Sequence, residues 1–135
     1  MKVLVADDTY VNRQILQTLL RKDGHSVVLA ENGKQAVAQF ETEQPDLIIM
    51  DLMMPEMDGK EATSLIKQRS GARFVPVIFL TAVTDEKGLT ECLASGGDDV
   101  LTKPYRLPLL RAKLSAWCRV QELHTRALEQ KQELE

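Results

Sequence analysis

The chain has 135 residues, the size of one domain, and 44% of them are hydrophobic, which suffices for a core of ordinary size. A formal net charge of −3 argues against a nucleic-acid-binding surface, which would normally be strongly basic. Cys92 and Cys118 have no metal-ligand spacing, so a zinc site is not expected and a reduced, cytoplasmic setting is the simplest interpretation. Met1 leads directly into an apolar segment and no apolar run is long enough to cross a bilayer, so we expect neither a signal peptide nor a membrane role.

Short apolar segments alternate with segments of helical periodicity along the chain. The apolar segments predict strands at 3–6, 25–30, 46–51, 76–82 and 100–102. Helices are predicted at 11–21, 33–40, 61–68, 85–95 and from about 107 to the end. On the first helix we expect the buried face to consist of Val11, Ile15, Leu16 and Leu19.

Four of the predicted strands are almost continuously hydrophobic rather than alternating. Such strands are typically buried on both faces, which happens in a parallel sheet that helices cover on both sides. The sequence therefore predicts a doubly wound α/β fold.

Polar residues stand where the predicted strands end. Asp7 and Asp8 follow the first strand, Asp51 ends the third, Thr81 lies near the end of the fourth, and Lys103 follows the fifth. Because the crevice of an open parallel sheet lies beyond the carboxyl ends of its strands, we expect these side chains at one edge. Three close carboxylates repel one another and need a cation, and oxygen ligands with room for water suit Mg²⁺.

The lysine makes sense at such a site if an anion such as a phosphoryl group also enters it. The metal and Lys103 would neutralise the phosphoryl oxygens and the Thr81 hydroxyl would donate to another. Asp51 lies between the acid pair and the Thr81–Lys103 side, so it is the best candidate for a nucleophile that forms an aspartyl phosphate.

Four segments in order, VLVADD, DLIIMDLMMPEMDG, PVIFLTA and GGDDVLTKPY, resemble the receiver domain of response regulators in two-component signalling. The resemblance covers roughly residues 2 to 118. It implies a flavodoxin-like (βα)5 fold with the parallel strand order 2-1-3-4-5. We accordingly predict a receiver domain at 1–118 and a helical extension at 119–135, which could be a coiled-coil linker.

The resemblance also implies roles for individual residues. Asp51 resembles the phospho-acceptor and a member of the metal site. Asp8 resembles the direct Mg²⁺ ligand, with Asp7 beside it, and Met53 would supply a backbone carbonyl to the metal. Thr81 resembles the switch hydroxyl and Lys103 the lysine that pairs with the phosphoryl group, and the bond from Lys103 to Pro104 is expected to be cis.

The partners follow from the same resemblance. The phosphodonor would be a phosphohistidine on a sensor histidine kinase or a phosphotransfer protein. The domain would be no dedicated enzyme: it would catalyse only its own phosphorylation and, more slowly, its own dephosphorylation.

The sequence departs from the family's pattern in two places. Val100 stands where many receivers carry Tyr or Phe, and a stiff valine cannot sweep out a comparable volume. We therefore expect the signal to pass through the backbone at 81–83 and the fourth helix. Met53 and Val83 would flank the entrance of the site, and neither can orient an attacking water, so we predict a phosphoryl lifetime of minutes to hours.

The C-terminal tail leaves alternatives open. Val120, Leu123, Ala127 and Leu134 fit an a/d spacing with Gln130 at a polar d position, over about two heptads. The tail is either a dimeric coiled coil or a solvated helix extension. The segment LEQKQELE resembles linkers before diguanylate cyclase or phosphatase output domains, so an output domain beyond residue 135 and a single-domain regulator both remain open.

Two rival functions differ in class from the signalling switch. A degenerate receiver would bind partners without phosphorylation. A haloacid dehalogenase-type phosphohydrolase also uses an aspartate nucleophile and Mg²⁺, but that class typically has a DxD motif on one strand end, whereas here Asp7, Asp8 and Asp51 come from two strands. A dinucleotide-binding domain is excluded because no G-x-G-x-x-G follows the first strand.

Overall fold

The computed structural model describes residues 1–82 and 85–134, and for residue 134 it describes the backbone alone. Its elements follow one another as β1 (Lys2–Ala6), α1 (Tyr10–Lys22), β2 (Ser26–Ala30), α2 (Gly33–Glu43), β3 (Leu47–Asp51), α3 (Gly59–Arg69), β4 (Val77–Thr81), α4 (Glu86–Ala94), β5 (Asp99–Thr102) and α5 (Leu107–Leu134). Each predicted strand and helix is present, and no end is displaced by more than three residues.

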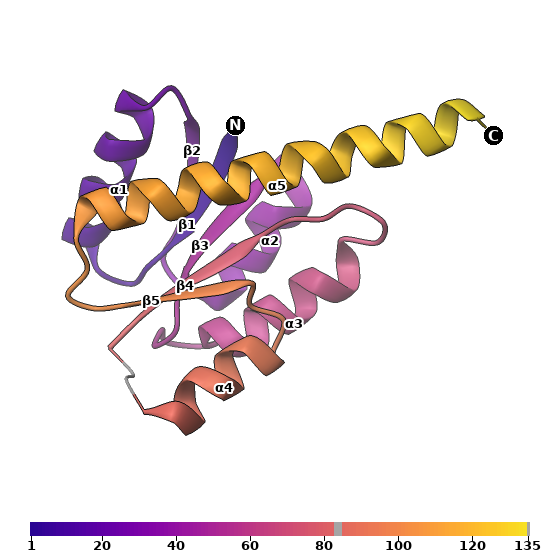
Figure 1. Cartoon of the computed structure of the whole chain (residues 1–135). Coiled ribbons are helices and arrows are strands. Elements are labelled where there is room, and N and C mark those ends of the chain that lie inside the picture. The colour runs from indigo at the N-terminus through magenta and orange to yellow at the C-terminus, as the bar shows by residue number, and fades with distance from the viewer. Residues whose placement is uncertain (83–84, 135) are drawn as a thin grey trace.

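The five strands form one parallel sheet in the order β2-β1-β3-β4-β5 (Figure 1). This confirms the doubly wound α/β class and the predicted strand order. The helices lie on both faces of the sheet, α1 and α5 on one and α2, α3 and α4 on the other.

Each face of the sheet has its own hydrophobic core. Alternate residues of the central strands point to opposite faces, so Val3 and Val5 meet α1 and α5 while Leu4 meets α2 and α3. All five residues of β3 are buried, including Asp51 at its end. The charge of Asp51 is therefore held in place by a strand that cannot move without disturbing both cores.

The predicted buried face of α1 is wrong for two of its four residues. Val11 and Ile15 are 60% and 47% exposed, whereas α1 buries Arg13, Leu16, Leu19 and Leu20. At 100° per residue, Val11 and Ile15 lie on the side of the helix roughly opposite to Arg13. Since α1 carries apolar residues on several sides, periodicity alone could not identify the side that faces the sheet.

The expectation of strands buried on both faces holds for β1, β3 and β4 but not for β2. Its first residue is exposed and the next three are only partly buried. β2 lies at the edge of the sheet, where a strand has a neighbour on one side only. β2 is therefore less buried than its apolar sequence predicts.

The 28-residue helix α5 runs without interruption across residue 118 and projects beyond the body of the domain (Figure 1). Leu110 and Leu114 are buried against the sheet and Trp117 is partly buried. Further along, the His124 ring lies 4.7 Å from the ring of Phe74 in the α3–β4 loop. Within the described residues, no helix combines the length and the apolar character needed to cross a bilayer.

The docking of α5 can be tested with two neighbouring leucines. Leu110 is fully buried whereas Leu109 is about half exposed. Leu110→Ala should lower the free energy of unfolding by about 2–5 kcal/mol, because it removes buried methyl groups and leaves a cavity. Leu109→Ala should change it by less than about 1 kcal/mol. Urea unfolding of both variants measures the difference, and equal losses would contradict the docking described here.

Candidate functional site

Three carboxylates meet at the carboxyl edge of the sheet, as the sequence indicated. Asp7 and Asp51 are 2% and 7% exposed, and Asp8 is exposed. One oxygen from each carboxylate lies within 4.8 Å of the other two. Their closeness follows from topology: β1 pairs with β3 and Ala6 lies opposite Met50, so the next residues of the two strands are Asp7 and Asp51.

Asp7 is held by the turn that leads into α1. The main-chain N–H of Thr9 donates to Asp7 Oδ1 at 2.8 Å, and Asn12 Nδ2 lies 3.4 Å from Oδ2. The sequence analysis did not identify Thr9 and Asn12 as parts of the site. An aspartate whose side chain accepts from the main-chain N–H two residues further on is a common turn pattern, so the segment DDTYVN carried a signal that could have identified Thr9.

Lys103 places its ammonium between two of the carboxylates. Its Nζ lies 3.7 Å from Asp7 Oδ2 and 3.6 Å from Asp51 Oδ2. The peptide bond to Pro104 is cis, as expected, and the main-chain N–H of Lys103 donates to the carbonyl of Thr81 at 2.7 Å. One ammonium cannot balance three ionised carboxylates, so the site keeps an excess of negative charge.

This environment raises the pKa of Asp51 above its ordinary value of 3.8. Burial contributes most, and the negative charges of Asp7 and Asp8 act in the same direction. Lys103 and a hydrogen bond from the main chain of Met53 pull the pKa back down without cancelling the rise. Ionising Asp51 is therefore less favourable than ionising an ordinary carboxyl, and another cation at the site would offset this cost.

The donor set suits a small divalent cation. Clustered carboxylate oxygens are hard ligands, and the exposure of Asp8 leaves room for water molecules that Mg²⁺ retains. Asp7, Asp8 and Asp51 are the residues that would hold the ion, and its charge would offset the repulsion among them. The carbonyl of Met53 remains a predicted ligand.

Of the other predicted residues, Thr81 lies at this edge, Met53 follows β3, and Val100 lies within β5. Thr81 is buried at the end of β4, in the strand next to that of Asp51. Met53 is exposed, whereas Val83, which we expect at the entrance, lies outside the described residues. Val100 is partly buried against the core on the α2–α3 face.

The loop that follows Asp51 is clamped by close backbone contacts. Gly59 donates its N–H to the carbonyl of Leu52 at 2.9 Å, and a Cβ built on Gly59 would lie only 2.3 Å from the carbonyl oxygen of Asp51. Gly33 of α2 donates to the carbonyl of Met57. These contacts were not predicted from the sequence, because they depend on how α2 and the start of α3 pack against the loop.

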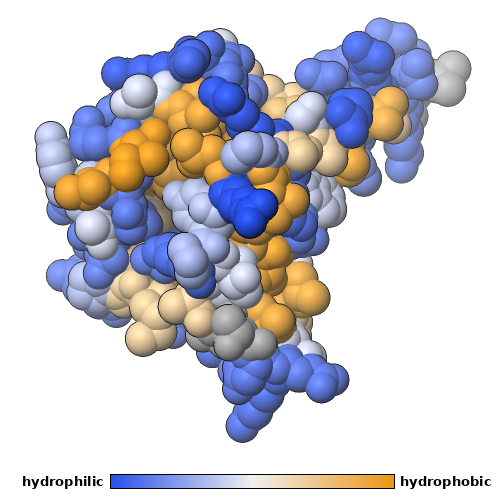
Figure 2. Space-filling model, turned by 60° about the vertical axis from the view of Figure 1, so that its left-hand side comes forward, coloured by the Kyte–Doolittle hydropathy of each residue, from blue (hydrophilic) through white to orange (hydrophobic). Residues whose placement is uncertain are grey.

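An apolar groove begins beside the site. Exposed apolar residues stand on α1 and at the start of α5: Tyr10, Val11, Ile15 and Leu107. Figure 2 shows hydrophobic side chains among polar ones on this side of the molecule. A hollow lined by Lys103, Pro104, Ile15 and Leu107, among others, lies at the site.

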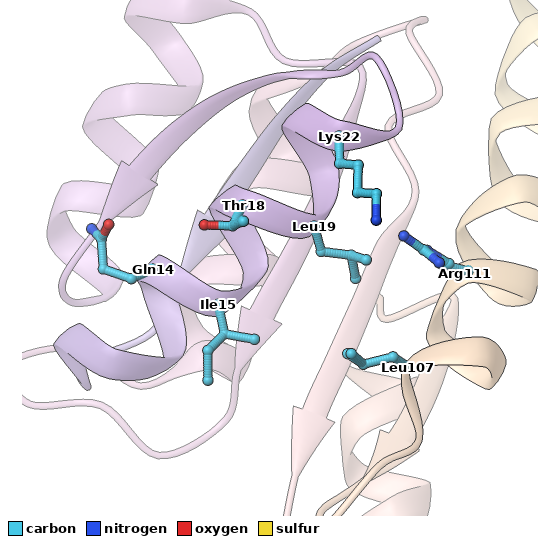
Figure 3. Close-up of a pocket in the computed structure, with 7 residues that line it drawn as sticks. All are labelled: Gln14, Ile15, Thr18, Leu19, Lys22, Leu107 and Arg111. Carbon is cyan, nitrogen blue, oxygen red and sulfur yellow. The ribbon is translucent and has the colours of Figure 1, made fainter.

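A second hollow of about 530 Å³ continues the groove between α1 and α5. It shares Ile15 and Leu107 with the first, so the two hollows adjoin. Lys22 and Arg111 approach each other at its far end (Figure 3). Arg111 there also pairs with Asp23.

The raised pKa of Asp51 has a consequence for stability. A carboxyl whose pKa is higher in the folded state than in the unfolded state costs stability as the pH rises through that interval. In metal-free buffer at pH 7, Asp51→Asn should therefore raise the Tm, and the gain should vanish below the ordinary pKa of 3.8. Asp58→Asn, at the exposed cap of α3, is the control and should bring no gain. A lower Tm for Asp51→Asn at pH 7 would show that pairing with Lys103 outweighs burial and repulsion.

The sequence of the chain is similar to sequences of known proteins. The sequence model of the response regulator receiver domain matches residues 3–115. The chain is 35% identical over 130 residues to the alkaline phosphatase synthesis transcriptional regulatory protein PhoP of Bacillus subtilis, covering 96% of this chain and 53% of that protein. It is 39% identical over 115 residues to the probable transcriptional regulator ycf27 of Guillardia theta, covering 85% of this chain and 44% of that protein. The chain thus spans about half the length of these curated relatives.

Solved structures of response regulators have the same fold as this chain. A two-component response regulator from Clostridium difficile superimposes with a TM-score of 0.82 at 30% identity, covering 88% of this chain and 96% of that one. The receiver domain of Ssk1 from Saccharomyces cerevisiae, solved in complex with the histidine phosphotransfer protein Ypd1, gives a TM-score of 0.79 at 35% identity, covering 87% and 88%. With three carboxylates and a lysine at the carboxyl edge of a 2-1-3-4-5 sheet, and with these matches, the chain belongs to the response regulator receiver domain family of two-component systems.

Proposed function

We propose that the domain is a phosphorylation-controlled switch in which Asp51 accepts a phosphoryl group. An oxygen of the Asp51 carboxylate attacks phosphorus, the P–N bond of a phosphohistidine breaks, and the histidine nitrogen keeps the electron pair. The observation that carries this proposal is the position of Asp51, buried at a strand end with Lys103 Nζ at 3.6 Å. Mg²⁺, when bound by the acid cluster, would supply the positive charge that the entering phosphoryl oxygens require.

The arrangement favours this switch over the two rival functions. Asp7, Asp8, Asp51 and Lys103 converge on one point, which a receiver that binds partners without phosphorylation would not require. In a haloacid dehalogenase-type hydrolase we would expect nucleophile and acid on one strand end, whereas here they end β1 and β3. The domain would then assist only its own phosphorylation and dephosphorylation.

The output of the switch would begin at Thr81. Its hydroxyl is expected to turn towards the phosphoryl group, and its carbonyl already accepts a hydrogen bond from the main chain of Lys103. Val100 offers too little volume for the aromatic movement seen in many receivers. The signal would instead pass through the backbone after Thr81 towards α4.

The groove between α1 and α5 is the surface on which the phosphodonor would dock. A phosphohistidine must reach Asp51 from outside, and the exposed apolar residues of α1 lie beside that opening and continue into the groove. A histidine kinase or a phosphotransfer protein is the partner we propose. The Ssk1 receiver domain, solved with Ypd1, is a relative captured with a protein of the second kind.

The C-terminal helix would connect the receiver with an output domain or a second copy. Val120 and Leu123 are exposed on α5, so the predicted a/d seam is available to a partner helix. The two curated relatives described above, about twice as long, are named transcriptional regulators, and they therefore lend no weight to the diguanylate cyclase or phosphatase type suggested by the tail. A homodimer through α5 stays part of the proposal. We expect the domain to work in the cytoplasm, where its two free cysteines would stay reduced.

Phosphorylation by acetyl phosphate tests the switch directly. The P–O bond of the donor would break and acetate would leave with the electron pair. Intact mass should show one added phosphoryl group on the wild type with Mg²⁺, and none without Mg²⁺ or with Asp51→Asn. Asp58→Asn should be labelled like the wild type. After removal of the donor, the label should decay over minutes to hours. Unlabelled wild type under all conditions would favour the degenerate receiver.

Docking can be separated from chemistry. With a histidine kinase that phosphorylates the wild type, Ile15→Asp should lower the rate of phosphotransfer about tenfold, because a charge at a central apolar contact typically costs more than 1 kcal/mol. Labelling by acetyl phosphate should not change, since Ile15 lies outside the acid cluster. Leu93→Asp, at a half-exposed position on α4, is the matched control. Equal losses of rate with the histidine kinase and with acetyl phosphate would show that Ile15→Asp disturbs the phosphorylation site rather than docking.

A further inference from the structure

Helix α1 buries one charged side chain, that of Arg13, which is 7% exposed. Its neighbours on the buried face are leucines. Removing a guanidinium from water costs free energy unless the charge is paired and its N–H groups find acceptors. A hydrophobic residue would have filled this position without that cost, so the contacts of Arg13 should show why a charge is placed there.

The contacts of Arg13 lead to the acid cluster. Its Nη1 donates to the main-chain carbonyl of Asp7 at 2.8 Å, and its Nη2 lies 3.6 Å from Glu31 Oε1, just after β2. The guanidinium carbon also lies 5.8 Å from the centre of the Tyr10 ring. Arg13 thus connects the main-chain carbonyl of Asp7, just after β1, with the carboxylate of Glu31, just after β2.

Asp7 is consequently fixed at three points. Its N–H donates to the carbonyl of Ala30 at 3.1 Å, its carbonyl accepts from Arg13, and its carboxylate accepts from the N–H of Thr9. The carbonyl of Asp7 belongs to the rigid peptide plane that continues into Asp8. A donor that fixes this carbonyl therefore also fixes the position of the Asp8 Cα, from which the Asp8 carboxylate reaches the site.

We propose that Arg13 is a positioning residue for the cation site, which it acts on through the peptide bond between Asp7 and Asp8. The inference rests on the proposed function, because it concerns the Mg²⁺ that Asp51 needs for phosphorylation. Residues that hold metal ligands in place by hydrogen bonds typically contribute 10- to 100-fold to metal affinity. Arg13 would contribute in this way although it touches neither the metal nor the phosphoryl group.

The charge of Arg13 and its geometry act in opposite directions, which makes the proposal testable. A positive charge near the site repels Mg²⁺, so deleting the charge alone should tighten Mg²⁺ binding. Losing the hydrogen bond to the Asp7 carbonyl should weaken binding, because the two carboxylates would no longer be held in a common orientation. The sign of the change shows which effect dominates.

The experiment uses the full chain and three variants. Arg13→Met removes charge and donors but keeps the length of the side chain. Arg13→Lys keeps the charge but can serve only one of the two partners. Arg69→Met removes an exposed arginine of α3 that pairs with Glu41 and is the control. The apparent Mg²⁺ dissociation constant is obtained from the rise of the Tm with Mg²⁺ concentration.

We expect the dissociation constant to rise about tenfold in Arg13→Met, to take an intermediate value in Arg13→Lys, and to stay unchanged in Arg69→Met. A purely structural role would lower the metal-free Tm and leave the dissociation constant unchanged, and that result, or tighter binding by Arg13→Met, would overturn the proposal. If Arg13→Met does not fold, Arg13→Lys decides, and a wild-type dissociation constant in it refutes the proposal. Acetyl phosphate labelling of the wild type tests the proposed function separately from the role of Arg13. If the wild type is not labelled, the proposed function is refuted whatever the Arg13 variants show.

Discussion

Repulsion among carboxylates that the sheet holds together is the constraint on which the functional end of this domain depends. Asp7 and Asp51 are buried and belong to a cluster whose oxygens lie within 4.8 Å. Two unit charges at that separation repel by roughly 3 kcal/mol at an effective dielectric constant of about 20. Neither residue can move away, because each follows or ends a strand in the middle of the sheet. Protonation or a nearby cation relieves the repulsion, and the ammonium of Lys103 lies within 4 Å of both carboxylates.

The position of Lys103 connects this charge balance with the rest of the molecule. Its main-chain N–H is bonded to Thr81 at the end of β4, and its side chain pairs with the ends of β1 and β3. A few residues later the chain enters α5, whose Leu107 lines the groove beside the site. A phosphoryl group that competes with Asp7 and Asp51 for the ammonium would therefore act on the strand end of Thr81 and on the start of α5 together.

The parts that could be predicted from the sequence are those that local patterns determine. Apolar runs that end in Asp7, Asp51 or Thr81 indicated both the parallel sheet and the edge at which these residues meet, because the topology of such a sheet leaves few alternatives. The buried face of α1 could not be predicted in the same way. Ile15 is as apolar as Leu16, and hydrophobicity does not distinguish a residue that fills the core from one that lines an external groove. Arg13 was missed for the converse reason, since its burial depends on a main-chain carbonyl that no side-chain pattern reveals.

The long helix α5 shows how a shift at the site could travel further. Asp99 at the start of β5 accepts hydrogen bonds from Trp117 and Lys113. Burial alone would raise its pKa, but the hydrogen bonds from Trp117, Lys113 and the main chain of Val100, together with the charge of Lys113, hold the pKa below the ordinary value. The helix is anchored again where the rings of His124 and Phe74 meet.

These anchors lie far from the acid cluster along α5, whereas Leu107 lies next to it. A continuous helix transmits displacement along its axis because its hydrogen bonds resist bending. A movement of the segment after Lys103 would therefore have to be absorbed at the start of α5 or passed to the contacts of Asp99 and Phe74. In the second case the exposed residues Val120 and Leu123 would change their orientation relative to the receiver body, which is the change that a partner on that face could sense.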